Sequence, residues 1–299
     1  MAIDAHRTPD DRFQDLPNWS YAPHYVETLP GYEGLRMHYV DEGPKDAETT
    51  FLCLHGQPTW SYLYRKMIPV FLEAGHRVVA PDHFGFGRSD KPKADETYTF
   101  HFHRNALKAF FEHMNLTNVC LVVQDWGGVL GLTIPMDYRD RITRLLVMNT
   151  GLGVGREPSQ GFADWKAYNA ANPDLDVAAL MKMSTPILSD AEAAAYAAPF
   201  PDKSYKAGVR RFPELVPIKP DMEGVDVSVT SATFLNQEWA GDSFMAVGMQ
   251  DIVLTPEIME TIRTVIKNCP ESMKLEEAGH FVQEWGAPVA REALKAFGL

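Results

Sequence analysis

The sequence has few cysteines, no excess of positive charge and no long apolar run. Its 299 residues include three cysteines, which show neither a metal-ligand spacing nor a disulfide framework, so we expect free thiols in a reducing, cytoplasmic compartment. The formal net charge is −12, which argues against nucleic acid as a partner. No segment is long and apolar enough to cross a membrane, and residues 1–14 are too polar for a signal peptide.

Strand and helix patterns alternate along the first half of the chain. Short apolar runs predict buried strands at 51–54, 77–80, 119–123 and 144–148, after a half-exposed strand at 35–39. Helical periodicity predicts helices at 62–72 and 100–114, with another after residue 125 that Pro135 should kink. This alternation predicts an α/β fold with a doubly wound, mostly parallel sheet and right-handed crossovers.

The pattern changes after residue 151. Residues 152–220 are rich in alanine and proline and contain short helical patterns without a convincing strand. A helix at 227–239 and a strand at 244–247 then resume the alternation, which ends with a helix, a strand and a helix. We therefore expect a core built in two parts, 1–151 and 221–299, with a helical cap at 152–220 above the strand ends.

The most informative segment is Val122-Val123-Gln124-Asp125-Trp126-Gly127-Gly128. An apolar strand stops at an acid, and two glycines precede a new apolar run. This layout is typical of a nucleophile elbow, the sharp turn between strand and helix that lifts one side chain above a parallel sheet. The usual occupant is serine, whereas here it is Asp125. The alternative is that Asp125 only caps the helix that follows.

An aspartate at this position narrows the chemistry. A serine that attacked a saturated carbon would form an ether, which water does not readily cleave, whereas a carboxylate forms an ester that water can hydrolyse. The carboxylate needs no activating base, because aspartic acid is ionised at neutral pH, and the positive end of the following helix favours its charge. Asp125 thus predicts displacement at an alkyl carbon through a covalent intermediate.

The remaining catalytic residues follow from chain order. In this fold class the nucleophile precedes an acid, and the acid precedes a histidine. Asp251 follows the predicted strand 244–247, and His280 lies in a short turn before the last helix. The alternatives are a turn aspartate and a surface-turn histidine. With Asp125, these two residues complete a catalytic set that needs no cofactor and no metal.

Two backbone N–H groups should stabilise the oxyanion of the ester-hydrolysis step. One belongs to Trp126, directly after the nucleophile. The other should come from the segment His55-Gly56-Gln57-Pro58, which follows the strand 51–54. Gln57 is the expected donor because proline has no N–H, and we interpret His55 as a structural residue.

These residues resemble the haloalkane dehalogenases of the α/β-hydrolase superfamily. The likeness covers nearly the whole chain and is carried by residues 54–65, the loop 82–92, the elbow and the segment 279–284. In that family a carboxylate displaces halide from a saturated carbon, and the tryptophan after the nucleophile binds the halide through its indole N–H. The resemblance implies the α/β-hydrolase fold with a helical cap, and it implies halide binding by Trp126.

The family has two relevant subgroups. One uses an asparagine two residues after the histidine of the His-Gly motif and an acid after the strand that precedes the cap, but Gln57 and Asn149 occupy these places. The other uses a second tryptophan in the cap and an acid two strands later. Trp165 and Asp251 match that pattern, so the resemblance implies the second subgroup and halide binding by Trp165.

The resemblance implies a small haloalkane and water as substrates, with an alcohol, halide and a proton as products. Phe162, Val129 and Phe281 are expected to line the substrate pocket, on position alone. The partners are then small molecules, with no nucleic acid and no membrane, and we expect a monomer.

Three rival functions share parts of this pattern. An epoxide hydrolase would use the same aspartate with proton-donating cap tyrosines, for which Tyr168, Tyr196 and Tyr205 are available. A fluoroacetate-type dehalogenase usually carries arginine after the nucleophile, where this chain has Trp126. A non-catalytic binding protein of this fold would be expected to lose members of the catalytic set, and all of them are present here.

Overall fold

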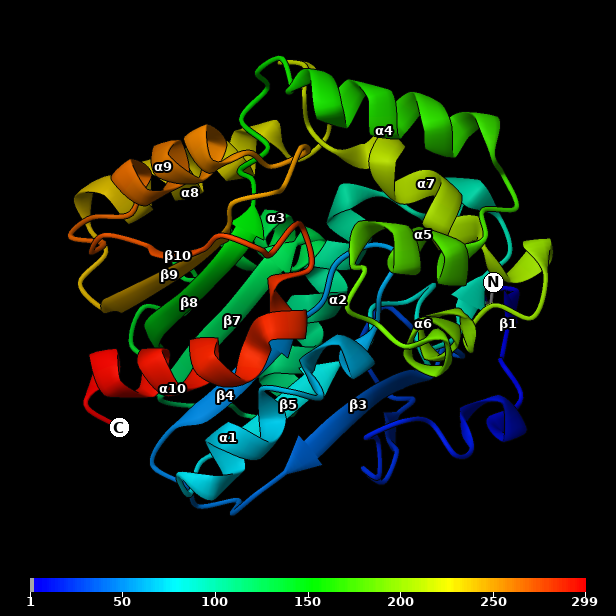
Figure 1. Ribbon diagram of the computed structural model, residues 1–299, viewed down its shortest axis with the longest axis horizontal. Coiled ribbons are helices and arrows are strands. Elements are labelled where there is room, and N and C mark those ends of the chain that lie inside the picture. The colour runs from blue at the N-terminus through cyan, green and yellow to red at the C-terminus, as the bar shows by residue number, and fades with distance from the viewer. Residues whose placement is uncertain (1–2) are drawn as a thin grey trace.

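An eight-stranded sheet forms the centre of the computed structural model, which describes residues 3–299 (Figure 1). The strand order is β10-β9-β8-β7-β4-β5-β3-β2. All neighbours from β10 to β5 are parallel, whereas β3 and β2 are antiparallel to their neighbours. The strands are β2 (His24–Val26), β3 (Met37–Glu42), β4 (Thr50–Leu54), β5 (Arg77–Pro81), β7 (Val119–Asp125), β8 (Ile142–Thr150), β9 (Asp242–Gly248) and β10 (Met273–Leu275). The predicted mostly parallel α/β sheet is confirmed.

The centre of the sheet is β7, flanked by β4 and β8. Every residue of β4 is buried, and so is every residue of β7 before Asp125, as expected for parallel strands covered on both faces. A separate antiparallel pair joins β1 (Ala5–His6) to β6 (Lys91–Pro92). These two-residue strands, like β2, are too short to produce a periodic pattern in the sequence.

Helices cover both faces of the sheet. In Figure 1, α1 and α10 lie in front of the strands, and α2 and α3 lie behind them. Helices α8 and α9 pack against one another beside β9. Their bounds are α1 (Ile68–Glu73), α2 (Phe100–His113), α3 (Trp126–Gly131), α8 (Val225–Gln237), α9 (Pro256–Val265) and α10 (Gly286–Phe297).

Two helix predictions were wrong, in each case near a proline. The predicted helix 62–72 is a 3-10 turn at Ser61–Tyr64 followed by α1, because Pro69 has no N–H and fits only the first turn of a helix. Pro135 does not kink α3, which ends at Gly131. The chain continues in turns, with the Ile134 N–H donating to Gly131 O, since a residue before proline disfavours the helical conformation.

Four α-helices and the 3-10 helix Lys203–Tyr205 occupy the chain between β8 and α8, and no described residue of this segment joins the sheet. In Figure 1, α4 and α7 lie above the ends of β7 and β8. Three of these helices have a side-chain N-cap: Ser159, Asp176 and Ser189 each accept a hydrogen bond from a backbone N–H of the first turn. The helices are α4 (Gln160–Ala171), α5 (Val177–Ser184), α6 (Asp190–Ala197) and α7 (Ala207–Leu215).

A buried ion-pair network attaches α6 to the rest of the molecule. The Arg65 guanidinium contacts Glu284 at 2.7 Å and Glu192 of α6 at 2.9 Å. The Trp60 indole N–H adds a hydrogen bond to Ala195 O at 3.2 Å. Because the ion pairs are desolvated, their main effect is to fix the position of α6. Among residues 3–299, no helix has the length and apolar character required to span a membrane.

Candidate active site

Strand β7 ends at Asp125 and helix α3 begins at the next residue. Asp125 has a φ of 49°, a conformation that is uncommon for a residue with a side chain. The two glycines that follow are required by close packing: a Cβ at Gly127 would lie 2.0 Å from Leu54 O, and one at Gly128 would lie 2.0 Å from Thr150 Oγ1. The sharp turn predicted from the sequence is therefore present, and it projects the Asp125 side chain beyond the sheet.

The Asp125 carboxylate does not cap α3, because it makes no hydrogen bond to the first turn of that helix. Its Oδ1 accepts a hydrogen bond from the Gln57 N–H at 2.7 Å. Its Oδ2 lies 3.4 Å from His280 Nε2. A Cβ at Gly56 would lie 2.2 Å from Asp125 Oδ1, so glycine allows the loop after β4 to approach the carboxylate.

Asp251 holds the other side of the His280 ring. Its Oδ2 lies 2.8 Å from His280 Nδ1, and its Oδ1 accepts the N–H groups of Val253 and Leu254. The Asn149 amide also donates to Asp251 Oδ2, at 3.0 Å. Burial favours the neutral acid, but the charge of His280 and these hydrogen bonds lower the pKa of Asp251 below its ordinary value.

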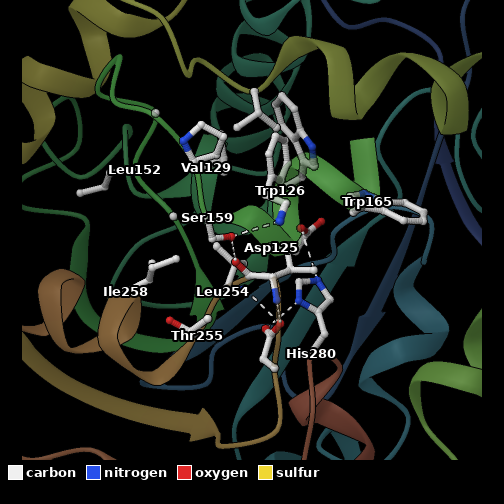
Figure 2. Close-up of a pocket in the computed structure, with 18 of the residues that line it drawn as sticks. Asp125, Trp126, Val129, Leu152, Ser159, Trp165, Leu254, Thr255, Ile258 and His280 are labelled. Atoms are coloured by element: carbon white, nitrogen blue, oxygen red, sulfur yellow. Dashed lines mark hydrogen bonds and ion pairs between the residues drawn. The ribbon is translucent and has the colours of Figure 1, made fainter. Parts of the chain in front are cut away.

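His280 lies between two carboxylates. Burial lowers its pKa, but the charges of Asp251 and Asp125 and their close contacts with the ring outweigh burial and raise the pKa of His280 to about 10. Figure 2 shows the ring beside the Asp125 carboxylate. Asp251 lies 2.8 Å from Nδ1 on its other side. At neutral pH the raised pKa favours the protonated ring, whose single positive charge lies between the two acids.

Two tryptophans line the cavity above Asp125. Trp126 is buried and packs on Phe212 at a ring-centroid distance of 4.6 Å, whereas Trp165 of α4 is half-buried. Figure 2 shows both indoles near the Asp125 carboxylate. Within residues 3–299 neither indole N–H donates a hydrogen bond, in contrast to the buried indoles of Trp60 and Trp239. The two N–H groups are thus available to a ligand.

The cavity has a volume of about 1390 Å³. It lies between the sheet end and the helices above it, and it continues between α8 and α9. Apolar side chains dominate its wall, and they include the three predicted from position, Phe162, Val129 and Phe281. Asp125 and His280 provide charged groups at its floor. The arrangement suits a mostly apolar small molecule.

The three tyrosines considered for proton donation are not together. Tyr168 lines the cavity. Tyr196 is fully buried and donates a hydrogen bond to Glu284, and Tyr205 stacks on the His6 ring at 4.5 Å. A pair of cap tyrosines facing Asp125, which epoxide opening requires, is therefore not formed by these residues.

His55 has a structural environment. Its ring is buried, with Nδ1 2.8 Å from Gly56 O and Nε2 accepting the His83 N–H at 2.9 Å. The neighbouring Asp82 accepts the Ser61 N–H and contacts His38. These contacts hold the loop that carries Gln57.

Sequence reasoning missed two residues that contact the catalytic set. Asn149 was considered only as a residue unsuited to serve as the acid, and Gln124 was not singled out. Asn149 donates to Asp251, and Gln124 donates to the His280 carbonyl at 3.0 Å. Their position in the sequence could have indicated these roles, because each lies at the carboxyl end of a central parallel strand, where functional groups gather.

The chain matches a family model described as the α/β hydrolase fold over residues 49–287. It is similar to a curated haloalkane dehalogenase of Psychrobacter cryohalolentis, with 40% identity over 93% of this chain and 92% of that protein. It is also similar to a haloalkane dehalogenase of Mycobacterium marinum, with 41% identity over 98% of this chain and 99% of that protein.

A solved structure supports the same likeness. It is described as the tetrameric structure of haloalkane dehalogenase DpaA from Paraglaciecola agarilytica NO2. The TM-score is 0.98 and the sequence identity is 55%, and the match covers 99% of this chain and 100% of that chain.

Proposed function

The chain belongs to the haloalkane dehalogenases of the α/β-hydrolase superfamily, and on that premise we propose that it converts haloalkanes to alcohol and halide through a covalent alkyl-aspartyl intermediate. The observation that carries the mechanism is the position of the Asp125 carboxylate. It projects from the turn between β7 and α3 into an apolar cavity, with the Gln57 N–H on one oxygen and His280 beside the other.

In the first half-reaction a carboxylate oxygen of Asp125 attacks the halogen-bearing carbon. The new C–O bond forms as the C–X bond breaks, and the halogen leaves with the bonding electron pair as halide. The indole N–H groups of Trp126 and Trp165 receive it. Each hydrogen bond to the anion contributes about 1.5–3 kcal/mol. These bonds strengthen as charge develops, so they favour the transition state over the substrate.

In the second half-reaction His280 acts as a base. Ester formation removes the negative charge of Asp125, which is one of the two charges that raise the pKa of His280. The pKa of His280 therefore falls after alkylation, the ring releases its proton to solvent, and the neutral ring can then take a proton from the water that attacks the ester carbonyl. The N–H groups of Gln57 and Trp126 stabilise the oxyanion. The tetrahedral intermediate then collapses, and the alcohol leaves with the proton held by His280. The regenerated Asp125 acid gives its own proton to the ring, which restores the starting state.

The same proposal assigns the chain to the subgroup with a second tryptophan in the cap and the acid after β9. It is supported by Trp165 in the cavity wall and by the short contact between Asp251 and His280. Residues 152–220 serve as the cap, with 1–151 and 221–299 as the core. The monomeric state stays a prediction from the sequence. The similar DpaA structure is described as tetrameric, so it does not support that prediction.

A matched pair of substrates tests this function. With 1-bromohexane we expect bromide and hexanol in equal amounts, and with 1,2-epoxyhexane we expect no diol above the enzyme-free blank. The reason is that the cavity offers indole donors for a halide but not the tyrosine pair that an epoxide oxygen needs. Ion chromatography and gas chromatography measure the products. Diol formation without bromide release would replace this function with an epoxide hydrolase.

Trp165→Phe tests the second halide donor. The change keeps an aromatic ring and removes one N–H, so we expect halide affinity to fall by about 10-fold to 100-fold, the equivalent of one hydrogen bond to an anion. Isothermal titration with bromide measures the affinity. Trp239→Phe is the matched control, because that indole donates to Ser243 outside the cavity and its loss should leave bromide affinity unchanged. Equal affinities in Trp165→Phe and the parent would remove Trp165 from the halide site.

A further inference from the structure

Gln124, the residue before the nucleophile, contacts the backbone of the catalytic histidine. Its side chain is fully buried, and its Nε2 donates to His280 O at 3.0 Å. Two successive residues of β7 therefore contact His280 in different ways. Asp125 faces the imidazole, and Gln124 holds the main chain that carries it.

The strand is irregular at this residue. Val123 pairs with Val147 of β8, but Asp125 pairs with Thr150, so two residues of β8 lie opposite Gln124. Such a bulge changes the direction of side chains near a site. Here it accompanies the placement of the Gln124 amide against the His280 loop and of the Asp125 carboxylate in the cavity.

Close packing restrains the His280 loop on its other side. A Cβ at Gly248 of β9 would lie 2.1 Å from Gly279 O, and the Gln250 N–H donates to Ala278 O at 2.9 Å. These contacts precede His280 in the chain. Among residues 3–299, the bond from Gln124 is the one hydrogen bond to the main chain of His280 itself.

The second half-reaction limits where the His280 imidazole can lie. His280 Nε2 lies 3.4 Å from Asp125 Oδ2, which is longer than an ordinary hydrogen bond. After alkylation the ring must contact a water molecule that attacks the ester carbon of Asp125. A loop displaced along β7 would bring the ring too close to the ester for that water, or too far away to reach it.

From these contacts, and given the dehalogenase mechanism proposed above, we propose that Gln124 is a positioning residue for the second half-reaction. Its amide sets the position of the His280 main chain at which the imidazole takes a proton from the attacking water. The first half-reaction does not use His280 as a base, so it does not depend on this bond. Gln124 thus affects hydrolysis of the alkyl-enzyme and not its formation.

Gln124→Met tests the proposal by separating the two steps. Methionine has a similar length and no N–H, and no described residue donates to Gln124 Oε1, so the change removes a single hydrogen bond. Rapid-quench measurement of bromide release should show alkylation within about twofold of the parent. Hydrolysis should slow between about tenfold and 100-fold, the effect of a small displacement of a reacting group. The alkyl-enzyme should then accumulate and be detected by intact mass.

Gln283→Met is the matched control. Gln283 is a buried glutamine three residues after His280, in the 3-10 helix Val282–Trp285, and its side-chain amide does not bond to His280. Its replacement should leave both rates unchanged. If methionine at 124 prevents folding, Gln124→Asn keeps the amide and shortens its reach by one methylene, and the same separation is expected.

The outcomes distinguish the two proposals. If the parent enzyme releases no halide, the proposed function fails. If the parent forms and hydrolyses an alkyl-enzyme but the Gln124 variants slow both steps equally, or neither step, the positioning role is wrong and Gln124 serves only the packing of β7.

Discussion

Asp125→Asn is expected to abolish halide release, with kcat reduced by about 10⁴-fold or more. The neutral amide oxygen is a far weaker nucleophile than a carboxylate oxygen. The replacement has nearly the same shape, and it retains an oxygen that can accept the Gln57 N–H. The cavity and the indoles of Trp126 and Trp165 should therefore remain in place. Single-turnover bromide release measures the effect, and circular dichroism shows whether the fold is retained.

Deamidation of the introduced asparagine back to aspartate would restore activity slowly, so the Asp125→Ala variant provides the control. Alanine cannot revert, and its intact mass can be checked before and after the assay. Neither variant should acquire an alkyl group when incubated with 1-bromohexane. Halide release by Asp125→Ala at more than about one hundredth of the parent rate would show that another group displaces the halide.

The local sequence was sufficient to predict the turn at Asp125 because the residues that form the pattern are the ones that the close packing of this turn requires. A buried strand, an acid and two glycines fit one geometry, in which α3 packs directly on β4 and β8. The chain order expected of the nucleophile, acid and histidine then indicated Asp251 and His280, and the structure places His280 beside Asp125 with Asp251 on the other side of its ring. Buried parallel strands were similarly predictable, since each is a short apolar run.

The contacts that position these residues could not be predicted from the sequence. Asn149 is on β8 and Asp251 follows β9, so their bond depends on how these two strands align. The Gln124 bond to His280 joins residues 156 positions apart and depends on a strand irregularity that leaves no sequence signal. The contacts of the cap tyrosines could not be predicted for the same reason. Tyr196 bonds to Arg65, and helical periodicity does not specify which residue a helical side chain contacts.

His280→Gln is expected to stop the reaction after the first half. The Asp125 carboxylate attacks the substrate without a base, so alkylation should proceed, whereas glutamine cannot take a proton from water. Removing a general base slows a step by about 10²-fold to 10⁴-fold. With 1-bromohexane we expect a burst of one bromide per chain and little release afterwards. Intact mass should rise by one hexyl group, and peptide mapping should place that group on Asp125.

The charges around His280 also predict that alkylation and ester hydrolysis respond differently to this substitution. In the unreacted protein the pKa of His280 is about 10, so the ring is protonated at neutral pH and is not available as a base. His280→Gln removes this positive charge but leaves both Asp125 oxygens in place. Alkylation in His280→Gln should therefore be no slower than about a tenth of the parent rate, since attack by the carboxylate uses no base.

The double variant Asp125→Ala with His280→Gln is the control for the position of the adduct, and it should show neither the burst nor the mass increase. A single His280→Gln variant that turned over 1-bromohexane at the parent rate would mean that water attacks without this imidazole. A variant that released no bromide at all, while retaining its fold and its bromide affinity, would mean that His280 acts before the ester forms. Either result would require a different order of events at Asp125, because the mechanism depends on a carboxylate that reacts first and a histidine that becomes a base only afterwards.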